Sequence, residues 1–221
     1  MNVLIIGASR GLGLEFVRQY RAAGARITAT ARDEAALDRL HAHGARALKL
    51  DVADTASVSG LAWLIDGEAF DVVVINAGVY GPSTAGLETP TEADFDNVMH
   101  TNVLAPMRLL PQIAEALAPG ARVAIISSKM GSIGLRASSS GWLYRASKAA
   151  VNSVMKDAAL ALAGKATVIS FHPGWVRTDM GGAGADIDAS TSIAGMRTVL
   201  ASVKPADTGS FFNYDGQRLA W

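Results

Sequence analysis

The stretch VLIIGASRGLG, at residues 3–13, joins an apolar run to a turn rich in glycine. Residues 3–7 have the length and composition of a buried β-strand. After the turn, Leu12, Phe16, Val17 and Tyr20 fall at helical spacing, and Gly24 ends the pattern. A strand, a glycine turn and a helix in this order predict the first unit of an α/β sheet.

The same alternation continues along the rest of the chain. Apolar runs predict further strands at 25–31, 47–52, 71–78, 121–128, 166–174 and, near the end, SFFNYDG at 210–216. Helices are expected over 33–44, 58–65, 92–117 and 143–163. Such alternation favours parallel strands joined by right-handed crossovers. We therefore expect a single domain over 1–221, built on one doubly wound parallel sheet of about seven strands with helices on both faces.

Two details of this organisation can be stated in advance. Thr91 and Asp94 resemble a capping box for the helix that follows, and Pro106 and Pro111 are expected to kink or interrupt it. The segment GGAGADIDASTS, residues 181–192, is rich in small residues, and we expect it to form a loop.

Composition excludes several classes of protein. Lys plus Arg and Asp plus Glu each number 20, and no long run of either sign occurs, which argues against binding to nucleic acid or to an anionic membrane. The chain has no cysteine, and the histidines at 41, 43, 100 and 172 have no acidic partners at ligand spacing, so no metal site is expected. Without a signal peptide or a long apolar segment, a cytoplasmic protein is the expectation.

The glycine turn, GASRGLG, carries the first functional hypothesis. Glycines at 7, 11 and 13 let the backbone approach a pyrophosphate, and the helix that follows offers free N–H groups to it. A tight strand–helix turn is the alternative. The position after the first strand favours a dinucleotide site.

Seven motifs in order resemble the short-chain dehydrogenase/reductase family, a group of oxidoreductases with a Rossmann-type sheet. They are GASRGLG at 7–13, LDV at 50–52, NAG at 76–78, the Asn102 region, ISS at 126–128, YRASK at 144–148 and HPGWVRTDM at 172–180. The ending YDGQRLAW and the short loop after Thr178 are similar to the carbonyl-reductase and C-factor-like branch. The resemblance implies a homodimer or homotetramer that acts on a small carbonyl or alcohol substrate.

The residues at the end of the second strand bear on the choice of cofactor. An acid there would bind the ribose 2′-OH of NAD(H), but this chain has Ala31 and then Arg32, and Arg10 stands in the glycine turn. Two guanidinium groups suit a 2′-phosphate, which favours NADP(H). By resemblance, further cofactor contacts are expected from Gly7, Ser9, Gly11, Leu12, Gly13, Asp51, Val52, Asn76, Ala77, Gly78, Tyr144, Lys148, Pro173, Gly174, Val176 and Thr178.

Two residues depart from the family pattern. Ile6 stands where the family commonly has threonine, and Ile75 where it often has a first asparagine. Apolar side chains there remove a possible link between two strands, so we expect a looser turn.

Tyr144 and Lys148 lie four residues apart and would share one face of a helix. An adjacent ammonium favours the phenolate and should lower the phenol pKa from its ordinary value of about 10. The family uses this tyrosine as the general acid/base, with the lysine on the nicotinamide ribose. Asn102 matches an asparagine thought to hold a water of the proton relay.

The substrate-polarising serine is ambiguous in the sequence. The family often places it 13 residues before the tyrosine, which here is Gly131. Aligning the strand end selects Ser128 instead and implies a three-residue insertion within 132–143, with Ser127 and Ser132 as alternatives.

The substrate itself is only outlined. Residues 129–143, with Val79, Tyr80, Trp142 and Trp175, would frame a partly aromatic pocket for an apolar carbonyl compound. Alternatives are a nucleotide-binding regulatory protein without turnover and a 3-oxoacyl-thioester reductase.

Overall fold

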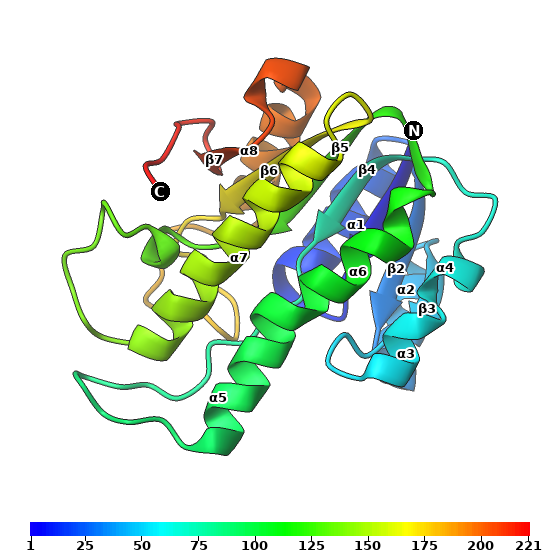
Figure 1. Ribbon diagram of the computed structural model, residues 1–221. Coiled ribbons are helices and arrows are strands. Elements are labelled where there is room, and N and C mark those ends of the chain that lie inside the picture. Colours follow the sequence, from blue (N-terminus) through cyan, green and yellow to red (C-terminus); the bar gives the residue numbers. More distant parts are fainter.

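The computed structural model describes residues 1–221 and contains one sheet of seven parallel strands in the order β3-β2-β1-β4-β5-β6-β7 (Figure 1). The strands are β1 (Asn2–Ile6), β2 (Arg26–Ala31), β3 (Arg46–Lys49), β4 (Phe70–Ile75), β5 (Leu117–Ile126), β6 (Ala166–His172) and β7 (Ser210–Asn213). The chain crosses from the β1–β2–β3 half to β4 beside β1, which makes the carboxyl ends of β1 and β4 the switch point of the sheet. The predicted doubly wound fold is confirmed.

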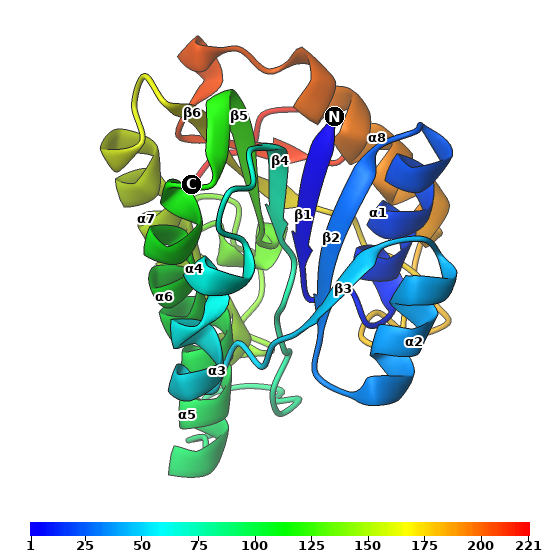
Figure 2. The same cartoon turned by 90° about the vertical axis from the view of Figure 1, so that its right-hand side faces the viewer.

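Helices cover both faces of the sheet, as the edge-on view in Figure 2 shows. One face carries α1 (Gly11–Ala22), α2 (Glu34–Ala42) and α8 (Ala189–Ser202). The other carries α3 (Thr55–Ser59), α4 (Leu61–Leu64), α6 (Ala105–Ala114) and α7 (Trp142–Ala161), while α5 (Glu92–Met99) continues through a π-helical turn (His100–Leu104) into α6. Short 3₁₀ turns lie at Lys129–Gly131 and Pro205–Asp207.

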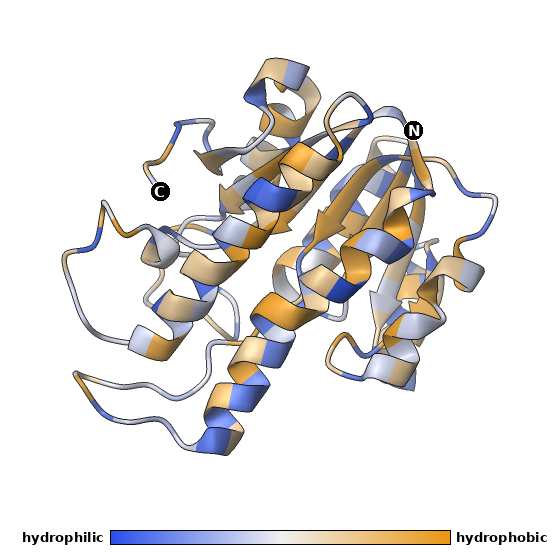
Figure 3. Ribbon diagram, viewed as in Figure 1, coloured by the Kyte–Doolittle hydropathy of each residue, from blue (hydrophilic) through white to orange (hydrophobic).

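Strand β1 shows how the sequence produces two cores. Its residues are fully or almost fully buried, with Val3 and Ile5 packed under α1 and α8, and Leu4 and Ile6 packed toward the α6 and α7 side. Side chains alternate across a strand, so a strand buried on both faces must be apolar throughout. Figure 3 shows the same pattern, with apolar strands between helices whose outer sides are mixed.

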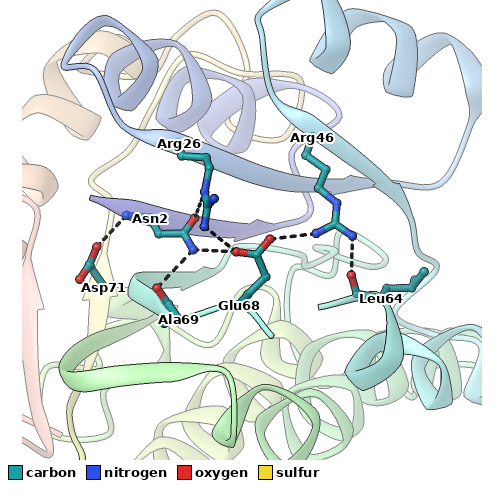
Figure 4. A network of polar contacts seen from close by, with 7 residues as sticks. All are labelled: Asn2, Arg26, Arg46, Leu64, Glu68, Ala69 and Asp71. Atoms are coloured by element: carbon teal, nitrogen blue, oxygen red, sulfur yellow. Dashed lines mark hydrogen bonds and ion pairs between the residues drawn. The ribbon is translucent and has the colours of Figure 1, made fainter. Parts of the chain in front are cut away.

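A polar network closes the amino-terminal edge of β1, β2 and β3 (Figure 4). The carboxylate of Glu68 accepts from Arg26 Nη2 at 2.8 Å, from Arg46 Nη1 at 3.0 Å and from Asn2 Nδ2 at 2.9 Å. The backbone N–H of Asn2 donates to Asp71 at 2.6 Å. One carboxylate therefore links three strands to the segment that leads into β4.

The structure corrects three expectations. Residues 181–192 are not all loop, because Asp188 caps α8 by accepting from the Thr191 N–H at 2.7 Å. This helix buries Ile193, Met196, Val199 and Leu200, which recur at helical spacing in the sequence. The region 58–65 forms two short helices rather than one. The helix predicted over 92–117 is interrupted by the π-helical turn before Pro106. Pro111 does not interrupt it and lies inside α6.

Candidate active site

A cavity of about 240 Å³ lies beyond the carboxyl ends of the central strands. Of the residues expected to bind the cofactor, it is lined by Gly7, Ser9, Arg10, Gly11, Leu12, Arg32, Asp51, Val52, Asn76, Ala77, Gly78, Tyr144, Lys148, Pro173 and Thr178. Gly13, Gly174 and Val176 stand outside the lining, as do Asn102 and Ser128. The cavity also meets Val79, Thr101, Asp179 and Met180, which the motifs did not assign to the cofactor.

The glycine turn is held tightly. Gly7 and Gly11 have φ of +85° and +53°, and a Cβ on Gly13 would lie 2.2 Å from the Gly7 carbonyl oxygen. Thr30 Oγ accepts from the Gly7 N–H at 3.0 Å, and Asn76 Nδ2 donates to the Gly7 carbonyl at 2.7 Å. Side chains of β2 and of the segment after β4 therefore supply links to the turn that Ile6 and Ile75 cannot make.

Two guanidinium groups line the end of the cavity next to β2, and a third lies beside the glycine turn. Arg10 and Arg32 are exposed, and Arg39 of α2 donates to the Ser9 carbonyl at 3.2 Å. Arg10 also pairs with Asp179. Arg39 was not foreseen, because its place beside the turn depends on how α2 packs.

The Asp51 carboxylate accepts from the Ala53 N–H at 3.0 Å and so caps a local turn after β3. Asp51 also lines the cavity, as its proposed cofactor contact requires.

Helix α7 presents Tyr144 and Lys148 on one buried face. Tyr144 is 7% exposed and Lys148 4%. The Lys148 Nζ lies 5.6 Å from the centre of the Tyr144 ring and donates to the Ile126 carbonyl at 2.9 Å. The end of β5 thus anchors the ammonium at the floor of the cavity.

Burial sets the protonation of this pair in the structure. It raises the pKa of Tyr144 to about 12, while a hydrogen bond with Ser128 acts in the lowering direction and the Tyr80 phenol in the raising direction. Burial also lowers the pKa of Lys148 to about 8. The expected lowering of the Tyr144 pKa by Lys148 is not found, because desolvation dominates.

Ser128, at the end of β5, is the serine beside Tyr144. Its Oγ also accepts from the Met130 N–H at 3.1 Å. Ser127 lines the cavity and donates to the Lys148 carbonyl at 3.4 Å, and Ser132 donates to the Ala220 carbonyl at 2.8 Å. All three serines bond backbone groups, but of the three only Ser128 also acts on the Tyr144 phenol.

Asn102 lies in the π-turn and holds the segment after β4. Its Nδ2 donates to the Val79 carbonyl at 2.8 Å and to Ser147 Oγ at 2.9 Å, while its Oδ1 accepts from the Val79 N–H at 2.9 Å. A Cβ on Gly78 would stand 3.3 Å from Asn102 Oδ1 and 3.4 Å from Lys148 Nζ. Gly78 is where Asn102, Lys148 and the β4 turn converge.

The segment after β6 completes the cavity. The Pro173 carbonyl accepts from Ser192 Oγ at 2.6 Å, Gly174 has φ of +84°, and Thr178 Oγ accepts from the Gly181 N–H at 3.2 Å. Val176 is buried and bridges to Ile187. The Tyr80 and Tyr144 rings have centres 4.6 Å apart and are tilted by 30°, but Tyr80, which the sequence predicts for the substrate pocket, does not line the cavity.

Comparison with known proteins agrees with this geometry. A family model described as short chain dehydrogenase matches residues 1–186. The chain belongs to the short-chain dehydrogenase family.

Three proteins of known name or structure are similar to the chain. The C-signal protein of Myxococcus xanthus is 37% identical over 154 residues, covering 68% of this chain and 92% of that protein. A short-chain dehydrogenase/reductase-type chain from Burkholderia multivorans, solved with bound NADP, is 31% identical with a TM-score of 0.90, covering 100% and 99% of the two chains. A carbonyl reductase from Pseudomonas aeruginosa PAO1 in complex with NADP is 32% identical with a TM-score of 0.86, covering 100% and 99%.

None of the helices of this short-chain dehydrogenase combines the length and apolar character needed to span a bilayer. No group of three or more His, Cys, Asp or Glu side chains is placed to hold a metal ion.

Proposed function

We propose that the protein is an NADP(H)-dependent oxidoreductase that interconverts a carbonyl compound and its alcohol. The observation that carries the proposal is that the Tyr144 phenol and the Lys148 ammonium lie together in the cavity lining, with Ser128 beside the phenol. A chain that only bound a nucleotide would have no use for a buried acid at this position.

The cavity suits NADP(H) at both ends. Gly7 and Gly13 leave no room for side chains in the turn that would receive the pyrophosphate. Arg10 and Arg32 would bind the 2′-phosphate, and no carboxylate at the end of β2 would repel it. Lys148, Pro173 and Thr178 would hold the nicotinamide half. When bound, this cofactor supplies or accepts the hydride.

The reduction adds a hydride to the carbonyl carbon and a proton to its oxygen. Ser128 would donate a hydrogen bond to that oxygen, and Tyr144 would transfer its proton as negative charge develops there. Burial keeps the Tyr144 phenol protonated at neutral pH, so it begins the reduction ready to donate. Lys148, 5.6 Å from the ring centre, would stabilise the phenolate left behind.

The substrate end of the cavity favours apolar carbonyl compounds. Val79, Pro173 and Met180 line it, and Tyr80 covers the Tyr144 ring. The loop before α7 is held by two hydrogen bonds, from the Gly141 N–H to the Thr84 carbonyl at 2.9 Å and from Trp142 Nε1 to the Glu88 carbonyl at 2.9 Å.

The test is NADPH oxidation with a panel of aldehydes, ketones, quinones and one 3-oxoacyl thioester. We expect turnover in the parent and a loss of at least about a hundredfold in kcat for Tyr144→Phe, since general acid catalysis contributes about 10²–10⁴. NADPH affinity should be nearly unchanged, and Tyr20→Phe, at a buried tyrosine of α1 outside this cavity, serves as the matched control. Tight NADPH binding without turnover on the whole panel would instead support the alternative of a regulatory protein. The similarity to C-signal is the observation that favours this alternative.

A further inference from the structure

A second cavity, of about 510 Å³, lies where α1 and α8 meet the amino-terminal half of the sheet. Val72 of β4 and Arg122 of β5 form its floor, and Tyr20, Arg197 and Leu200 form its sides. The proposed active site occupies the carboxyl ends of the same strands, so none of its residues line this second cavity.

The side chains that line the second cavity include two arginines, Arg122 and Arg197, and no acidic residue. Arg122 takes part in no ion pair or side-chain hydrogen bond. Arg197 donates from Nη1 to Gln19 Oε1 at 3.2 Å and interacts with the Tyr20 phenol, while its buried Nε has no partner. Buried polar groups without partners are costly, and each one found in a folded protein calls for an explanation.

Tyr20 adds a third donor between the two arginines. The side chain is 3% exposed, and the Arg197 guanidinium lies 4.7 Å from the centre of its ring. The positive charges of Arg197 and Arg122 both act on the phenol, but burial dominates and raises its pKa to about 12. The phenol therefore stays protonated and can donate to an anion at neutral pH.

The apolar residues that line the cavity indicate which class of anion it can bind. Val72 and Leu200 face the cavity beside the two arginines, and six of the nine lining residues are hydrophobic. Inorganic phosphate would leave these walls without contacts, whereas an organic carboxylate uses both features. We propose that this cavity binds an organic carboxylate, its anionic group between Arg122 and Arg197 and its apolar part against Val72 and Leu200. This site does not depend on the proposed oxidoreductase activity.

Binding is measured by calorimetry with hexanoate, hexanamide and inorganic phosphate as probes, in protein saturated with NADPH so that the active-site cavity is occupied. We expect hexanoate to bind, hexanamide to bind at least about tenfold more weakly, and Arg122→Met and Arg197→Met each to weaken hexanoate binding by about tenfold or more. A charge-assisted hydrogen bond contributes about 1.5–3 kcal/mol, which corresponds to roughly 10–150-fold. Arg108→Met, on α6 and outside the cavity, is the control.

Arg122→Lys guards against a folding defect, since it retains the charge and loses only the forked geometry. We expect an unfolding temperature near that of the parent and intermediate affinity. Equal binding of hexanoate and hexanamide, unchanged affinity in both methionine variants, or no hexanoate binding at millimolar concentration would each overturn the proposal. Binding of phosphate but not hexanoate would overturn the assignment of an organic ligand.

Discussion

Arg10 Nη1 lies 2.8 Å from Asp179 Oδ2, so an ion pair joins the glycine turn to the segment after β6 across the mouth of the cavity. The two side chains are 73% and 72% exposed, and pairs of this kind contribute about 0–1 kcal/mol. The same guanidinium is proposed to bind the 2′-phosphate. Asp179 therefore competes with the cofactor for Arg10.

Asp179→Asn should tighten NADPH binding by up to about fivefold, because it frees Arg10 from an interaction of at most about 1 kcal/mol. Affinity for NADH should not change, since NADH has no 2′-phosphate. Fluorescence titration with both cofactors measures the effect, and Asp157→Asn on α7 is the control. Weaker NADPH binding in Asp179→Asn would show that Asp179 supports the site rather than competing in it.

Arg32→Ala should weaken NADPH binding by about tenfold or more and leave NADH binding within about twofold. A guanidinium bonded to a phosphate contributes roughly 1.5–3 kcal/mol, and the change removes that contact alone. Arg18→Ala on the exposed side of α1 controls for net charge. Equal losses for both cofactors would contradict the assignment of Arg32 to the 2′-phosphate.

Lys148 should make stability rise with pH in the alkaline range. Burial lowers its pKa from 10.5 to about 8, so below pH 8 the folded protein carries a disfavoured ammonium. Between pH 8 and 10.5 the folded state releases this proton while the unfolded state keeps it. Over that range the free energy of unfolding should increase by about 1.4 kcal/mol for each step of one in pH. Urea unfolding of the parent and Lys148→Met at several pH values isolates this contribution, and parallel pH curves for the two proteins would refute it.

Asn102→Ala should destabilise the protein by about 2–4 kcal/mol and lower kcat. It leaves the Val79 N–H and carbonyl and the Ser147 hydroxyl without their partner, and an unsatisfied buried group costs about 1–3 kcal/mol. Thermal unfolding and steady-state kinetics are the measurements. Asn97→Ala, an exposed position on α5, should change neither.

Ser128→Ala should lower kcat about tenfold or more, because it removes the hydroxyl beside Tyr144. Ser132→Ala should mainly raise KM, since Ser132 ties the loop before α7 to the Ala220 carbonyl. If Ser132→Ala carried the larger loss of kcat, the serine assignment would be reversed.

The strands and the glycine turn could be predicted because each depends on local sequence. VLII is apolar at every position, and Gly7 sits at its end. Contacts that depend on how elements pack were harder to predict. Thr30 and Arg39 reach the turn from β2 and α2, and neither carries a motif. Helix α8 was missed because its small residues at the start conceal the buried positions at 193, 196, 199 and 200.

The π-turn at His100–Leu104 makes the protein sensitive to the insertion or deletion of a residue in this segment. The turn follows α5 and leads into α6, which buries Leu109 and Ile113. Within the turn, Asn102 is fixed by three hydrogen bonds. Removing one residue would let the segment become a regular helix, but everything on one side would rotate by about 100°. Either Asn102 or the buried stripe of α6 would then face the wrong way. Libraries that vary this protein by insertion or deletion should therefore find residues 100–109 intolerant of a change in length, even at the exposed positions where a substitution is tolerated.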